Sequence, residues 1–164
     1  MFRLFLIFTG SFGASFFLLW ATDGIAHTFF KNINSVMFPL GALFGALSFA
    51  FFNYVEGIIK DVPKKLKTQK PAAYALVIKS LTNLKNEVIL NVILVIFLTI
   101  IGFISSSADA IIPPFELEVK KYWTWCILAL HGACFLTTLA VITVQLTGFI
   151  TANNLRAELS MNSD

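Results

Sequence analysis

The stretch that decides the fold of this chain is Lys60–Lys85, which reads KDVPKKLKTQKPAAYALVIKSLTNLK. It holds seven of the twelve Lys and Arg residues and lies between two long apolar runs. Lysine clusters beside apolar segments are typical of the cytoplasmic loops of membrane proteins. The stretch therefore predicts that the chain spans a membrane, and it assigns each apolar segment a direction.

The composition agrees with a membrane protein. The chain is 57% apolar and 13% charged, whereas a soluble domain usually carries about 25% charged residues. Four apolar runs of spanning length leave no room for a second soluble domain, so we expect one all-α, polytopic membrane domain over residues 1–164. The four predicted transmembrane helices cover residues of about 4–22, 35–60, 88–105 and 123–150.

The distribution of basic residues predicts that the N- and C-termini are cytoplasmic. The basic residues expected inside are Arg3, the seven lysines of Lys60–Lys85 and Arg156, and those expected outside are Lys31, Lys120 and Lys121. Nine inside against three outside is a firm positive-inside bias. The basic loop is also expected to touch anionic lipid headgroups.

A cytoplasmic basic loop with an amphipathic helix is predicted over residues 61–87. Pro71 suits the first turn of a helix, and apolar residues then recur at helical spacing. We expect this helix to run unbroken from residue 71 to residue 104. Its apolar stripe needs cover, which lipid, neighbouring spans or a cytosolic partner could supply. The residues predicted to dock a partner are Lys64, Lys65, Lys67, Tyr74, Val77, Ile78 and Leu81.

Small residues predict where helices pack closely. The second span contains a GxxxG motif with a serine one turn later, and glycine lets helix backbones approach each other. The predicted packing residues there are Gly41, Gly45 and Ser48, and a second small patch in the first span holds Gly10, Gly13, Ala14 and Ser15. Asn34 or Ser35 is expected to cap the second span, with Pro39 in or near its first turn.

Four polar residues within the spans form a predicted layer in the inner leaflet, namely Asn53, Glu56, Asn91 and Gln145. Their matched depth suggests that they meet. Three interpretations are open. The residues form interhelical hydrogen bonds, worth about 0.6 kcal/mol each; they line an ion path with Glu56 as its charge; or Glu56 pairs with Lys60 four residues on.

Catalytic motifs are missing from the sequence, which has no HExxH, GxSxG, CxxC or Walker pattern. Cys126 and Cys134 are about 12 Å apart along a helix, too far for a disulfide. Asp23 and His27 fit either a solvated turn or a pH- or metal-sensitive spot without further ligands. We therefore expect no enzyme activity and no cofactor. No motif favours direct nucleic-acid binding. The roles of His131 and of the outer loop 106–122, with its Pro113–Pro114 pair, stay open.

The layout resembles small four-span bacterial phage-defence membrane proteins, such as the membrane subunit of the Kiwa system and the membrane partner in the lambda Rex exclusion system. The matching features are the four spans, the inner segment Lys60–Lys67, the amphipathic lead into span three and the polar segment Asn153–Arg156. The resemblance covers the whole chain as a layout and carries over no functional residue. It implies an oligomeric sensor or pore of the bacterial inner membrane that acts with a soluble cytosolic effector.

Two functional hypotheses follow. The first is a homo-oligomeric membrane anchor or sensor for a cytosolic effector, favoured by the amphipathic stripe and the basic loop. The second is a small ion-conducting pore or transporter subunit, favoured by the polar layer.

Overall fold

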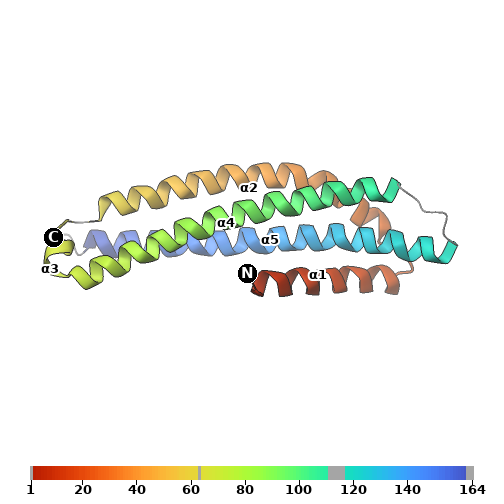
Figure 1. Cartoon of the computed structure of the whole chain (residues 1–164), viewed down its shortest axis with the longest axis horizontal. Helices are drawn as coiled ribbons and strands as arrows, with labels where there is room; N and C mark the ends of the chain where they lie inside the picture. Colours follow the sequence, from red (N-terminus) through yellow and green to blue (C-terminus); the bar gives the residue numbers. More distant parts are fainter. Residues whose placement is uncertain (1, 63, 111–116, 162–164) are drawn as a thin grey trace. The chain divides into compact units, whose positions relative to one another are not determined.

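The computed structural model describes residues 2–62, 64–110 and 117–161. These ranges contain helices and no strand, so the expected all-α class is confirmed. The helices are α1 (Phe2–Ala21), α2 (His27–Asp61), α3 (Lys64–Gln69), α4 (Pro71–Ala110) and α5 (Leu117–Met161) (Figure 1).

Four of the helices are long and apolar enough to cross a membrane. The segments that qualify are Leu4–Ala21, His27–Asp61, Pro71–Ala108 and Glu118–Glu158. Each contains or nearly matches one of the predicted spans. Large apolar side chains such as Phe38 and Phe103 are exposed on these helices, as expected where lipid rather than water is the solvent. These features are typical of a multi-pass membrane protein.

The start of α2 differs from the prediction. Asn34, Ser35 and Pro39 all lie inside the helix, which begins at His27, so the expected cap and the expected place of Pro39 are wrong. Phe30 is buried three residues before Ile33, and this helical spacing extends the packed face toward the N-terminus. Ser35 does not cap but donates to the backbone oxygen of Asn32 at 2.7 Å, a bond that serine commonly makes within helices.

Helix α4 is continuous over its 40 residues, which confirms the predicted unbroken helix through the third span. At 1.5 Å per residue it is about 60 Å long, and the 45-residue α5 is about 68 Å long. Both helices extend into the predicted outer loop. The Pro113–Pro114 pair lies outside the described residues, as does Pro63.

The chain divides into two compact units. Unit 1 comprises Met1–Leu43 and Leu94–Val141, and unit 2 comprises Phe44–Ile93 and Ile142–Asp164. The buried core of unit 1 consists of Leu19, Phe30, Ile33, Met37, Leu98, Trp125, Leu128, Ala129 and Cys134. That of unit 2 consists of Phe51, Val55, Ile58, Val62, Leu81, Val88 and Ala152.

Candidate functional site

The amphipathic stripe of α4 is covered by the protein itself. Leu81 is completely buried in the core of unit 2, and Tyr74, Val77 and Ile78 pack against that core from partly buried positions. Lipid, neighbouring spans and a cytosolic partner were the expected covers for this stripe. The structure shows neighbouring helices in that place. Lys67 is exposed, whereas the side chains of Lys64 and Lys65 lie outside the described part of the chain. Docking of a partner at these positions stays a prediction.

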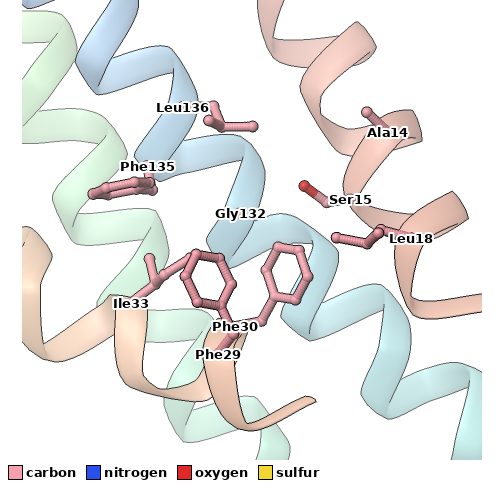
Figure 2. Close-up of a pocket in the computed structure, with 9 residues that line it drawn as sticks. All are labelled: Ala14, Ser15, Leu18, Phe29, Phe30, Ile33, Gly132, Phe135 and Leu136. Atoms are coloured by element: carbon pink, nitrogen blue, oxygen red, sulfur yellow. The ribbon is translucent and has the colours of Figure 1, made fainter. Parts of the chain in front are cut away.

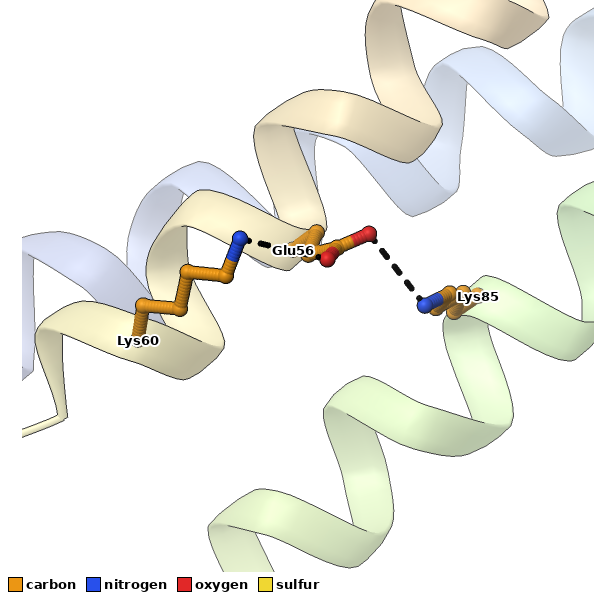
Figure 3. A network of polar contacts seen from close by, with 3 residues as sticks. All are labelled: Glu56, Lys60 and Lys85. Atoms are coloured by element: carbon orange, nitrogen blue, oxygen red, sulfur yellow. Dashed lines mark hydrogen bonds and ion pairs between the residues drawn. The ribbon is translucent and has the colours of Figure 1, made fainter.

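A three-residue charge cluster joins α2 and α4 in unit 2 (Figure 3). Glu56 Oε1 lies 3.2 Å from Lys60 Nζ, and its Oε2 lies 3.4 Å from Lys85 Nζ. Lys85 Nζ also stands 4.4 Å from the centre of the Phe52 ring, a favourable cation–π geometry. The Glu56–Lys60 pairing is as predicted, whereas the role of Lys85 was not predicted. Glu56 is therefore held between two cations.

A second polar group joins α2 to the end of α5. Tyr54 donates its hydroxyl hydrogen to Asn153 Oδ1 at 3.0 Å. Arg156 lies over the Tyr54 ring at 5.5 Å and pairs with Asp61 at 3.5 Å. Because Asp61 and Arg156 are largely exposed, each such pair contributes only about 0–1 kcal/mol. Sequence reasoning missed this group, since contacts between residues about a hundred positions apart leave no local pattern.

The predicted polar layer is brought together only in part. Gln145 Nε2 donates to Ser48 Oγ at 2.7 Å, and both side chains are buried. Asn91 is also buried and lines a small crevice together with Gln145. Asn53 lies on an exposed face of α2. Of the four predicted residues, Asn91 and Gln145 therefore share a crevice, and Ser48, which had been predicted only for packing, bonds to Gln145.

The GxxxG face of α2 contains three different environments. A Cβ at Gly41 would lie 3.4 Å from Thr99 Oγ1 of α4, an ordinary contact within unit 1. In unit 2, a Cβ at Gly45 would meet nothing within 4 Å, whereas Ser48 bonds to Gln145. The packing role predicted for Gly45 therefore has no partner helix among the described residues and stays a prediction.

Gly132 of α5 lies in close contact with side chains of α1 and α2, and the sequence did not reveal this contact. A Cβ there would lie 2.5 Å from both Phe30 Cε1 and Ser15 Oγ. Figure 2 shows Ser15 of α1 and Phe30 of α2 beside this part of α5. Together with Gly132 they line an apolar pocket of about 200 Å³. Ser15 belongs to the predicted small patch of the first span. Its partner was missed because one glycine in an apolar helix carries no signal.

Two polar contacts of unit 1 involve titratable residues, an ion pair of Asp23 and a contact of His131. Lys121 Nζ lies 2.7 Å from Asp23 Oδ1 and 4.8 Å from the centre of the Trp125 ring. Asp23 therefore pairs with Lys121, and a bond to His27 is not among the contacts observed. Buried His131 has its Nε2 3.2 Å from Ser106 Oγ. This contact joins α4 and α5.

Metal chemistry finds no support in the described residues, which contain no cluster of three His, Cys, Asp or Glu side chains. Cys126 is exposed, Cys134 is buried, and both are free thiols. The groups that unit 2 brings together are amides, hydroxyls and paired ions.

No family model, curated protein or solved structure matches this chain.

Proposed function

We propose that this chain is a non-enzymatic, multi-pass protein of the bacterial cytoplasmic membrane that anchors a soluble protein partner. The observation that carries the proposal is the length of α4 and α5, about 60 and 68 Å. The hydrocarbon core of a bilayer is only about 30 Å thick. Roughly half of each helix therefore lies outside the hydrocarbon, where water-soluble proteins can reach it.

The projecting ends are those that carry the positive charge. Lysines gather between Lys60 and Lys85, and Arg156 stands near the end of α5. The positive-inside rule assigns these ends to the cytoplasm. The ion pairs that Glu56 and Asp61 make there suit an aqueous or interfacial setting.

The docking surface we propose is the exposed side of the α3–α4 segment. Leu76 is 70% exposed, and Lys67, Lys70 and Lys79 are exposed around it in the sequence. An apolar side chain among lysines fits a partner with an apolar patch bordered by acidic residues. The buried Leu81 serves the core of unit 2.

Purification from the native host in mild detergent, with native mass determination, tests this proposal. We expect a homo-oligomer that carries one defined soluble protein. The Leu76→Glu variant should lose that protein, while Thr82→Glu, exposed on another side of α4, should keep it. A homo-oligomer with nothing attached, or equal recovery with both variants, would count against anchoring.

The layout resemblance makes phage defence the setting to test first. Cells with a deletion of the gene should then show increased plaque formation by at least one phage. Restoration by wild type and not by Leu76→Glu would link the phenotype to the proposed surface.

An ion-conducting pore or transporter subunit is the second candidate. The buried contact between Ser48 and Gln145 favours it, because polar groups within membrane spans often mark ion pathways. Protein reconstituted in vesicles should then pass ions, and Glu56→Gln should change the conductance. The absence of ion flux under steps of voltage and pH would eliminate this candidate.

A further inference from the structure

Unit 2 contains an apolar groove of about 420 Å³ between α2 and α5. Both helices contribute exposed apolar side chains to its lining, namely Leu47, Ala50, Leu146 and Phe149. The polar residues of the lining are Tyr54 and Gln145, and Gln145 Nε2 is already bonded to Ser48. Because exposed side chains line the groove, it is open to the surroundings of the chain.

An arginine stands at one edge of this groove. Tyr54 lines the groove, and the guanidinium carbon of Arg156 lies 5.5 Å from the centre of the Tyr54 ring. The Tyr54 hydroxyl is bonded to Asn153 at 3.0 Å, which fixes the ring beside Arg156. Asp61 contacts Arg156 Nη2 at 3.5 Å, but a guanidinium carries five N–H donors, so donors remain for a second anion. The apolar groove therefore ends at a cation.

The chemistry of the groove and its edge restricts the occupant. Both helices that form the groove are long and apolar enough to cross a membrane, where the medium at the open side is hydrocarbon rather than water. An acyl chain suits the apolar lining, and a phosphate suits Arg156, because a guanidinium binds phosphate through two parallel hydrogen bonds. Tyrosine is enriched at the level of the lipid headgroups, and Tyr54 lies between the two parts. A phospholipid combines both chemistries in one molecule.

We propose that the groove between α2 and α5 binds an anionic phospholipid. One acyl chain lies in the groove against Leu47 and Leu146, and Arg156 binds the phosphate beside Tyr54. A zwitterionic lipid binds less tightly, because its cationic end is repelled by the Arg156 guanidinium. The proposal rests on the membrane location proposed above and not on a soluble partner. It is distinct from the expected contact of the basic loop with lipid, since this site belongs to α2 and α5.

Native mass spectrometry of the full chain in a non-ionic detergent tests the proposal. The delipidated protein is titrated with phosphatidylglycerol and with phosphatidylcholine that carries the same acyl chains. We expect the first phosphatidylglycerol to bind about fivefold more tightly, which corresponds to the roughly 1 kcal/mol of one basic side chain near anionic lipid. Equal affinities for the two lipids would overturn the proposal. No soluble partner is needed, so this outcome is separate from that of the anchoring experiment.

Two substitutions that remove the same charge locate the phosphate. Arg156→Gln should lower the affinity for phosphatidylglycerol to that for phosphatidylcholine. Lys60→Gln removes one positive charge elsewhere in unit 2, where Lys60 pairs with Glu56 and is not part of the groove lining, so the fivefold preference should remain. An equal loss of preference in both variants would indicate attraction by the overall charge and would contradict the site.

A third substitution tests the groove itself. Ala50→Phe places a ring in the space assigned to the acyl chain, so occupancy of the first site by either lipid should be lost. Ala42→Phe is the matched control, because Ala42 is exposed on the same helix but lies outside the groove lining, and lipid binding should persist. Lipid binding that persists in Ala50→Phe would overturn the proposal. If the subunit number changes in that variant instead, the groove belongs to a second copy of the chain.

Discussion

At the scale of single residues, Gly132 has a tight environment within unit 1. Adding a methyl group there would bring a carbon 2.5 Å from Ser15 Oγ and from Phe30 Cε1. We expect Gly132→Ala to lower the free energy of unfolding by about 1–3 kcal/mol, as overpacking does in cores. Denaturant titration in detergent measures this. Gly10→Ala is the matched control, because its Cβ would meet nothing within 4 Å. Equal effects of both variants would contradict a packing role for Gly132.

The hydrogen bond between Ser48 and Gln145 is the second feature at the scale of single residues. Polar contacts between membrane helices average about 0.6 kcal/mol, with a maximum of about 1.7 kcal/mol. We expect a coupling energy in this range from a double-mutant cycle with Ser48→Ala and Gln145→Leu, measured by the same unfolding titration. Strictly additive effects would mean that the 2.7 Å contact is not maintained in a bilayer.

At the scale of elements, substitutions on the two sides of α4 should change the free energy of unfolding by different amounts. Leu81 is fully buried, whereas Leu76 is 70% exposed. Leu81→Ala should therefore cost about 2–5 kcal/mol of unfolding free energy through cavity formation, while Leu76→Ala should change it by less than about 0.5 kcal/mol. The unfolding titration separates the two. A neutral Leu81→Ala would mean that the stripe is not part of the protein's own core, and would favour lipid or a partner as its cover.

The ends of the elements depended on packing more than on local signals. Asn34 and Ser35 are good capping residues and Pro39 is a good first-turn residue, yet α2 passes through all three. The burial of Phe30 and Ile33 in unit 1 extends the helix past them, because packing contributes more to helix stability than a cap does. In α4 the local sequence signals agreed with the packing, and the predicted unbroken helix is observed.

At the scale of the whole molecule, the distribution of charge predicts the topology. A cysteine at position 69 should be cytoplasmic and one at position 120 should be outside, since nine basic residues are expected inside and three outside. In a Cys126→Ser background, which removes the exposed native thiol, a membrane-impermeant maleimide should label Lys120→Cys in intact cells. It should label Gln69→Cys only after lysis. Labelling of Gln69→Cys in intact cells would reverse the topology.

The sequence by itself determined the helical class, the four apolar segments long enough to cross a membrane and the continuity of α4. These properties depend on composition and short-range periodicity, which can be read within a window of about twenty residues. The pairing of Glu56 with Lys60 was predictable for the same reason, because residues four apart on a helix face each other.

Only the tertiary structure decided which distant side chains meet. It placed Lys85 beside Glu56, Gln145 beside Ser48, and Ser15 beside Gly132. It also showed that Leu81 belongs to the core of unit 2. In each case the contact depends on how one helix is rotated against another. That rotation is set by the packing of many apolar side chains together, so no short stretch of sequence contains it.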